Sequence, residues 1–293
     1  MNIFLTGSSG FVGTSVIKYF GEENIQKYKR NQNIHLDNER VIIHLAGKST
    51  DSKITANSDE YYLVNTDFTK EIFDKFLHSD AVIFIFLSSV KAAADEIDCD
   101  LTEDHNPNPQ THYGKSKLLA EQYILSKQIP ANKRIYVLRP CIIHGPGNKG
   151  NLTMLYNFVR KSIPWPLAAF SNKRSYCSID NLLFVLKELI ERADIPSGIY
   201  NIADDDPVST NEIIKLMSQS SAKKPRLWSI SQRIIRLIAR VGDVLNLPLN
   251  TERLQKLTES YIVSNKKLKQ ALGKKLPVTS TEGLIITFDS FKL

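Results

Sequence analysis

Gly7-Ser8-Ser9-Gly10-Phe11-Val12-Gly13 stands close to the N-terminus, with glycine at its first, fourth and seventh positions. The short apolar run Asn2 to Thr6 precedes it and predicts a strand, and Phe11 to Phe20 follows with apolar residues near helical spacing. Glycines in such a turn permit close approach of a phosphate, and the free N–H groups of the helix N-terminus attract its charge. A glycine-rich turn that binds nothing is the competing interpretation. We predict a Rossmann-type dinucleotide turn whose cofactor-binding residues are Gly7, Ser9, Gly10, Phe11, Val12 and Gly13.

Strand-like and helix-like stretches alternate through the first two hundred residues. Only about twenty residues separate the first helix from Val41, which leaves room for a short second strand near Ile25 to Lys29 and little else. One helix of a full doubly wound half is therefore expected to be missing. The alternation favours an α/β fold, a Rossmann-type doubly wound parallel sheet with helices on both faces. The other expected elements are strands at Val41 to Leu45, Ala81 to Leu87, Ile135 to Leu138 and Gly198 to Ile202, and helices at Asn65 to Leu77 and Lys115 to Ser126.

Turn-forming residues mark a change in the chain after residue 144. Gly145-Pro146-Gly147 and Ile163-Pro164-Trp165-Pro166 both indicate turns. We expect residues 1–144, together with about 176–200, to form the dinucleotide-binding Rossmann domain. Residues from about 145 to 175 and from 201 to 293 are expected to form a smaller C-terminal substrate-binding lobe.

The composition is that of an ordinary globular protein, with 42% hydrophobic and 24% charged residues in a chain of 293. Its three cysteines, Cys99, Cys141 and Cys177, have no paired spacing, so we expect neither disulfides nor a metal site, and a cytoplasmic location fits best. The net charge of +7 is scattered and lacks the basic stripe of a nucleic-acid reader, so no nucleic-acid partner is expected. No apolar run approaches the roughly 20 residues of a membrane helix.

A second motif, Tyr113-Gly114-Lys115-Ser116-Lys117, sets a phenol and an ammonium group four residues apart at the start of a predicted helix, so both face one way. To serve as a base near neutrality, a phenol of pKa about 10 needs a shift of about 3 units, or about 4 kcal/mol. One cation at about 4 Å supplies roughly that much at an effective dielectric constant of about 20. Incidental tyrosine and lysine on an amphipathic helix is the alternative. Ser88 and Ser89 favour the catalytic interpretation, because they end a predicted central strand where ligand crevices lie.

The segment Lys27-Tyr28-Lys29-Arg30 stands where the second strand should end, about 20 residues after the glycines. An acidic side chain at that place holds the ribose hydroxyls of NAD, whereas basic residues suit the extra phosphate of NADP. We therefore expect Lys29 and Arg30 to bind the cofactor, with NADP favoured over NAD. A solvated basic turn is the other interpretation.

Together these motifs resemble the extended short-chain dehydrogenase/reductases, and among them the NAD-dependent epimerase/dehydratase family that acts on nucleotide sugars. The resemblance covers nearly the whole chain and includes His44-Leu45-Ala46-Gly47, Leu138-Arg139-Pro140 and Arg174 to Asp180. It implies that Tyr113 is the acid/base, that Lys117 lowers its pKa and binds the nicotinamide ribose, and that Ser89 bonds the reacting sugar oxygen. Arg174 resembles the arginine that meets the diphosphate. The further implied contacts are Leu45, Ala46, Gly47, Asn65, Ser88, Lys117 and Pro140 for the cofactor, and Ser89, Lys91, Tyr113, Asn151, Arg174 and Arg253 for the substrate.

Departures from the family pattern narrow the activity. Val90 and Lys91 stand where dehydratases place an acidic pair, so dehydration is disfavoured. A 4-epimerase with retained NAD and a 4-keto-sugar reductase of a UDP-linked (N-acetyl)hexosamine both remain, and the basic residues Lys29 and Arg30 favour the reductase. A catalytically silent NAD(P)-sensing regulator is the alternative from another class, although such proteins typically lack the Tyr-Lys pair.

Ser229 to Leu247 has the pattern of a basic amphipathic helix, with Arg233, Arg236 and Arg240 on one side. Such a helix would contact an anionic membrane surface and reach lipid-linked sugars. A helix packed in the substrate lobe with solvated arginines is the other interpretation. The resemblance also implies a homodimer.

Overall fold

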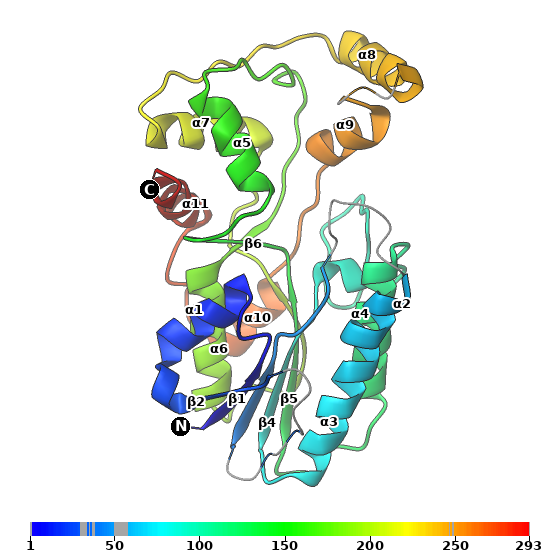
Figure 1. Ribbon diagram of the computed structural model, residues 1–293, viewed down its shortest axis with the longest axis vertical. Coiled ribbons are helices and arrows are strands. Elements are labelled where there is room, and N and C mark those ends of the chain that lie inside the picture. Colours follow the sequence, from blue (N-terminus) through cyan, green and yellow to red (C-terminus); the bar gives the residue numbers. More distant parts are fainter. Residues whose placement is uncertain are drawn as a thin grey trace.

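The computed structural model describes residues 2–29, 34, 36, 39–49, 58–245, 247 and 249–292. Its main sheet has six parallel strands in the order β2-β1-β3-β4-β5-β8 (Figure 1). The chain therefore changes direction of winding between β1 and β3, and ligands of such sheets bind outside the carboxyl ends of the strands at this point. The strands are β1 Ile3–Thr6, β2 Ile25–Lys27, β3 Val41–His44, β4 Ile83–Leu87, β5 Arg134–Pro140 and β8 Gly198–Ile202.

Alternating residues of the strands supply two apolar layers, one on each face of the sheet. Leu5 and Ile43 point to the layer that contains α1 (Phe11–Phe20) and α6 (Ile179–Glu191). Their neighbours in the strands, such as Phe4 and Ile42, point to the layer with α3 (Phe68–His78) and α4 (His112–Leu125). The strands are buried on both faces, which explains their nearly continuous apolar sequences. Figure 1 shows α1 and α6 on one side of the sheet and α3 and α4 on the other.

A third apolar cluster lies in a smaller region beyond the carboxyl ends of the strands. It is built around Tyr156, Trp165, Ile213 and Phe288. A two-stranded parallel sheet, β6 (Ile142–His144) with β7 (Tyr176–Ser178), leads into this region. Its helices are α5 Asn151–Arg160, α7 Thr210–Ser220, α8 Gln232–Leu245, α9 Thr251–Thr258 and α11 Ser280–Ser290. Helix α10 (Lys266–Leu272) packs against β8 of the main sheet instead. The other helical elements of the described residues are η1 Glu22–Asn24, α2 Ser58–Tyr62, η2 Leu63–Asp67 and η3 Val90–Ala92.

The predicted α/β fold with a smaller C-terminal region is confirmed, and the largest differences between predicted and observed starts are those of two helices. The helix expected at Asn65 begins at Ser58 and passes through a π-helical turn, η2, before continuing as α3. The helix expected at Lys115 begins at His112, because the Thr111 hydroxyl accepts a hydrogen bond from the N–H of Gly114 at 3.2 Å and caps the first turn. The described residues between β2 and β3, which are 28, 29, 34, 36, 39 and 40, are not helical, and the predicted absence of a helix in this stretch stays a prediction.

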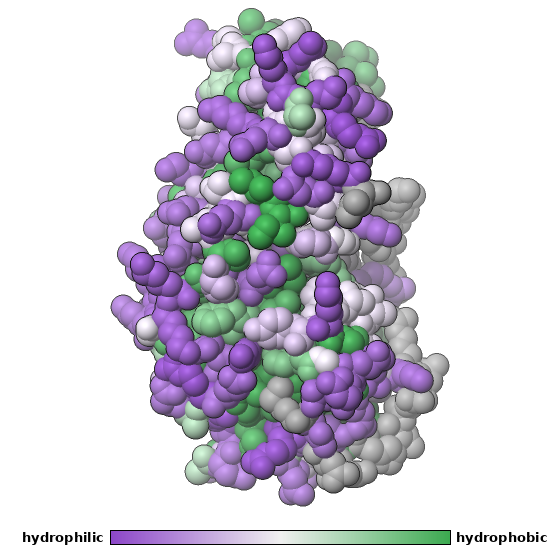
Figure 2. All heavy atoms as spheres, turned by 90° about the vertical axis from the view of Figure 1, so that its left-hand side faces the viewer, coloured by the Kyte–Doolittle hydropathy of each residue, from purple (hydrophilic) through white to green (hydrophobic). Residues whose placement is uncertain are grey.

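The surface on the side of α1 and α11 is dominated by hydrophilic side chains, with apolar ones in small groups between them (Figure 2). No helix among the described residues has the length and apolar character needed to cross a bilayer.

Candidate active site

The glycine turn packs so closely that two of its glycines have no room for a side chain. Gly7 has φ +70°, and a Cβ there would lie 2.7 Å from the backbone nitrogen of Ala46, directly after β3. A Cβ on Gly13 would lie 2.2 Å from the carbonyl oxygen of Gly7. The turn therefore lies against Leu45 and Ala46 at the carboxyl edge of the sheet, and α1 starts within it at Phe11.

Alanine at Gly7 should destabilise the protein more than alanine at Gly147. Both glycines have positive φ, +70° and +86°, but a Cβ on Gly147 meets nothing within 4 Å. The left-handed backbone alone costs an alanine about 1–2 kcal/mol, and Gly7→Ala adds a clash with backbone atoms. We expect a larger loss of unfolding free energy in urea for Gly7→Ala, together with weaker NAD(P) binding by fluorescence titration. Equal losses for the two variants would show that the close approach at Gly7 is relieved at little cost.

Lys117, Asn65 and Gly47 meet beside this turn. The Nζ of Lys117 is buried and donates a hydrogen bond to the carbonyl oxygen of Leu87 at 2.9 Å. A Cβ on Gly47 would lie 2.9 Å from that Nζ and 3.1 Å from Oδ1 of Asn65. Asn65 is held in place because its amide donates to the carbonyl oxygen of Lys48 and to the Ser116 hydroxyl. Burial lowers the pKa of Lys117 to about 8, against the opposing effect of Glu121.

Tyr113 and Ser89 also meet, and here the electrostatics differ from the sequence-based expectation. Burial raises the pKa of the Tyr113 phenol above its usual value of 10, and a hydrogen bond with Ser89 opposes that rise. Lys117 was expected to lower this pKa, but the influences on the phenol are burial and Ser89, and Nζ of Lys117 bonds the carbonyl oxygen of Leu87 instead. Removing a phenolate from water costs free energy, and for this buried phenol that cost outweighs the hydrogen bond with Ser89.

A buried ion pair supports the same site and was not predicted from the sequence. Arg139, on β5, forms a bidentate pair with Glu121 of α4, with Nε 3.0 Å from Oε1 and Nη2 2.5 Å from Oε2. Both side chains are at most 2% exposed. The Ser88 hydroxyl donates to Oε1 of Glu121. Because Glu121 lies four residues after Lys117 and eight after Tyr113, all three share one face of α4, and that spacing was the available signal.

Of the other predicted substrate residues, Lys91 and Arg174 form a charged group with Glu259, and Asn151 and Arg253 lie apart from it. Lys91 is largely buried, with Nζ 2.5 Å from the carbonyl oxygen of Asp95 and 4.3 Å from the centre of the Tyr261 ring. Burial lowers its pKa. Arg174 pairs with Glu259 at 2.6 Å. Asn151 is exposed at the first turn of α5, and Arg253 is exposed on α9.

The remaining predicted cofactor residues lie around the sheet edge. Ser9 and Gly10 are exposed, Phe11 and Val12 are partly buried in the first turn of α1, and Pro140 is buried at the end of β5. Lys29 is exposed two residues beyond β2. Arg30 lies outside the described residues.

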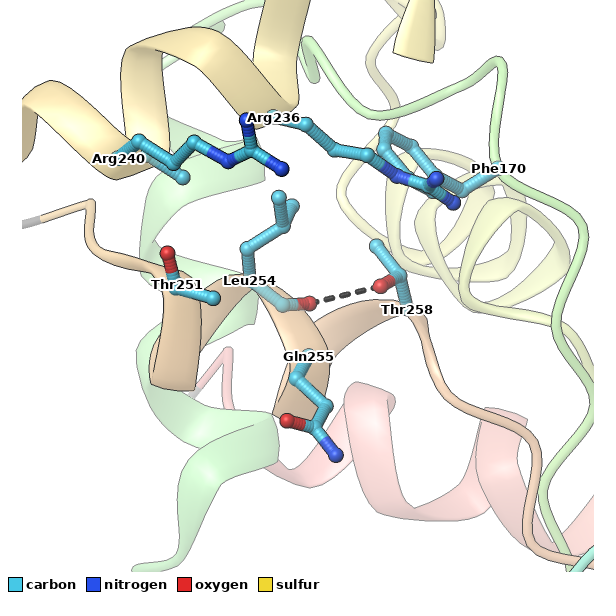
Figure 3. A pocket seen from close by; sticks show the side chains of 8 residues that line it. Phe170, Arg236, Arg240, Thr251, Leu254, Gln255 and Thr258 are labelled. Carbon is cyan, nitrogen blue, oxygen red and sulfur yellow. Dashed lines mark hydrogen bonds between the residues drawn. The ribbon is translucent and has the colours of Figure 1, made fainter. Parts of the chain in front are cut away.

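A hollow of about 260 Å³ lies between α8 and α9 (Figure 3). Arg236 and Arg240 extend over it from α8, and Thr251, Gln255 and Thr258 line it from α9. Thr258 directly precedes Glu259, the partner of Arg174, so the hollow lies near the outer end of the charged group.

His44 at the end of β3 gives the stability a measurable pH dependence. Its ring nitrogens lie 2.7 Å from the Thr6 hydroxyl and 2.9 Å from the Thr69 hydroxyl. Burial, helped by the charge of Lys117, lowers its pKa to about 3 from the usual 6.5. Between these two values the unfolded chain binds a proton that the folded protein excludes, so stability falls as the pH falls below 6.5.

We expect His44 to remove up to about 2 kcal/mol of unfolding free energy between pH 6.5 and 5. Urea unfolding of the wild type and of His44→Gln at both pH values measures the difference in slope. The variant loses stability at both pH values, but its pH slope should be smaller. An unchanged slope would mean that other groups cause the acid sensitivity.

The geometry can be set beside known proteins. The model of the 3-beta hydroxysteroid dehydrogenase/isomerase family matches residues 25–231, which is more than half of the chain. The chain belongs to this family. Membership in the 3-beta hydroxysteroid dehydrogenase/isomerase family confirms the predicted kinship with extended short-chain dehydrogenase/reductases and the prediction of an NAD(P)-dependent enzyme of that type.

Two relatives are sugar epimerases. The UDP-glucose 4-epimerase of Vibrio cholerae is 26% identical, over 99% of this chain and 95% of its own. The N-acetyl-alpha-D-glucosaminyl-diphospho-ditrans,octacis-undecaprenol 4-epimerase of Escherichia coli O157:H7 is 25% identical, over 76% of this chain and 73% of its own.

Solved structures share the fold of this chain along nearly its whole length. The UDP-glucuronic acid 4-epimerase of Bacillus cereus in complex with NAD has a TM-score of 0.75 at 18% identity, covering 100% of this chain and 99% of that one. RMD from Pseudomonas aeruginosa complexed with NADPH has a TM-score of 0.73 at 17% identity, covering 99% of both chains.

Proposed function

We propose that this chain is an NAD(P)-dependent 4-epimerase that acts on a sugar linked to a diphosphate carrier, with a nucleotide sugar as the first substrate to test. The observation that carries the proposal is that the Tyr113–Ser89 pair and the buried ammonium group of Lys117, bonded to Leu87 at the end of β4, lie at the sheet edge that also carries the glycine turn. The likeness to the Vibrio cholerae epimerase over 99% of the chain supports an epimerase over the reductase that Lys29 and Arg30 favoured.

The residues around the glycine turn fit a dinucleotide. No side chain caps α1 at Gly10, so the first N–H groups of that helix are available to a diphosphate. Gly47 leaves space beside Lys117 Nζ that a side chain would fill, which suits a ribose hydroxyl. When bound, NAD(P) supplies a hydride acceptor and donor for the sugar carbon.

Tyr113 takes the proton of the sugar hydroxyl in one half of the reaction and returns it in the other. Ser89 holds the same oxygen through the hydrogen-bond network that it forms with Tyr113. Lys117, with a pKa of about 8, is mostly protonated at neutral pH and offers its positive charge beside Gly47, where it would bind the nicotinamide ribose. Arg174 binds the diphosphate of the substrate, and its ion pair with Glu259 breaks when it does so.

Purified protein incubated with candidate substrates tests this function. The candidates are UDP-glucose, UDP-N-acetylglucosamine, a polyprenyl-diphosphate N-acetylglucosamine chosen from the Escherichia coli relative, and a 3β-hydroxysteroid chosen from the family description. We expect the 4-epimer of one sugar to appear with NAD and without net NADH formation. Stoichiometric NADPH oxidation with a 4-keto-sugar would establish the reductase instead. Cofactor binding without any turnover would favour a regulator and contradict the proposal.

The basic segment after β2 tests the choice of cofactor. Replacing Lys29 and Arg30 together by glutamine should weaken NADPH binding by about tenfold or more, the value of one charge-assisted hydrogen bond, and leave NADH binding nearly unchanged. Titration of both cofactors against wild type and variant gives the two ratios. Equal effects on both would mean that the segment does not contact the 2′-phosphate.

A further inference from the structure

Helix α8 exposes most of its apolar side chains. Its buried residues are Ile235, Ala239 and Gly242, and the first two join the cluster that contains Leu254 of α9. Six large apolar residues lie outside that contact, and Leu237 and Val244 are 62% and 79% exposed. At the helical period the six form one continuous stripe, which is more than the isolated apolar residues of an ordinary surface. They are Ile234, Leu237, Ile238, Val241, Val244 and Leu245.

A row of cations borders this apolar stripe. Arg233, Arg236 and Arg240 are exposed and follow each other at helical spacing along one edge of it. Among the described residues, no ion pair engages any of the three. Asp243, the one acidic residue of α8, accepts hydrogen bonds from Thr251. The helix therefore presents an apolar face with a positive edge, and Arg236 and Arg240 of that edge also extend over the hollow between α8 and α9.

We propose that α8 docks the protein on an anionic lipid bilayer. The helix lies in the plane of the interface, with the apolar stripe among the acyl chains and the three arginines against lipid phosphates. The positive edge of this face and the net charge of +7 of the whole chain favour an anionic bilayer as the partner. A second copy of the chain would bring a row of arginines towards an identical row, whereas a negatively charged bilayer attracts it.

The place of α8 in the fold suits such contact. It lies at the end of the molecule farthest from the amino ends of the sheet strands (Figure 1), so docking does not require the sheet to approach the bilayer. The fourteen residues of α8 are enough to lie on a surface, and neither α8 nor any other described helix is able to span a membrane.

Co-sedimentation of the whole protein with vesicles tests the docking. The vesicles contain phosphatidylglycerol and phosphatidylethanolamine in one arm and phosphatidylcholine alone in the other. We expect sedimentation with the anionic vesicles only. The variant Leu237→Ser/Val244→Ser keeps the net charge, so a loss of binding by about tenfold or more would identify the apolar stripe as the contact. Arg233→Gln should also weaken binding and reduce its salt dependence.

Met154→Ser/Leu125→Ser is the matched control, because both side chains are large, apolar and exposed on α5 and α4. It should sediment as the wild type does, and thermal melting verifies that each variant is folded. A wild type that stays in solution with anionic vesicles would overturn the proposal, as would equal binding by the α8 and control variants. Light scattering that shows a dimer broken by the α8 variant, without vesicle binding, would assign the stripe to a second copy and also overturn it.

Discussion

Replacing Tyr113 by phenylalanine should lower kcat by about 10²–10⁴-fold, because it removes the group that moves the proton. The ring stays, so the packing of the site and the binding of NAD(P) should change little. The relevant measurements are the turnover of whichever sugar the substrate screen identifies and a separate cofactor titration. Because burial raises the pKa of this phenol, the wild-type rate should increase with pH above neutrality, where the base form becomes more populated.

Tyr61→Phe is the matched control for this variant. Its ring lies 6.5 Å from that of Tyr113, so it tests the loss of a hydroxyl from the same part of the site. We expect its kcat to stay within a few-fold of the wild type. Normal turnover in Tyr113→Phe would show that another group moves the proton, and equal losses in both variants would indicate a general disturbance of the site.

The local parts of the site were predictable from the sequence because the signals for them are local. The glycines at positions 7, 10 and 13 lie between a strand and a helix in the sequence itself, and the four-residue spacing of Tyr113 and Lys117 fixes their common face once α4 is predicted. The alternation of apolar runs gave the parallel sheet for the same reason. These inferences need no knowledge of which elements touch.

The parts that depend on tertiary contacts could not be predicted. Glu121 has the sequence context of a solvated helix residue, and its burial follows only from the packing of α4 against β5, where Arg139 lies. The direction of the Tyr113 pKa shift depends on how much water the folded site excludes, against the opposing hydrogen bond with Ser89. For α8 the sequence predicted an amphipathic helix but not which of its apolar residues the lobe covers.

Removal of Glu121 should be among the most damaging single changes in the protein. Glu121→Ala leaves the guanidinium of Arg139 buried without its carboxylate, which costs about 3–5 kcal/mol of unfolding free energy. It also removes a charge that raises the pKa of Lys117, so that pKa should fall below its present value of about 8. Urea unfolding measures the first effect, and the pH dependence of cofactor binding follows the second.

Replacing both partners distinguishes an ion pair from a residue that simply fills space. In Glu121→Leu/Arg139→Met the charges disappear together, and well-packed apolar pairs often match or exceed the stability of the buried pair that they replace. The double variant should therefore be more stable than either Glu121→Leu or Arg139→Met alone. Since Nη1 of Arg139 finds no hydrogen-bond partner among the described residues, its removal also eliminates a buried polar atom without a partner. If the double variant lost as much unfolding free energy as the two single variants together, Glu121 and Arg139 would not be directly coupled.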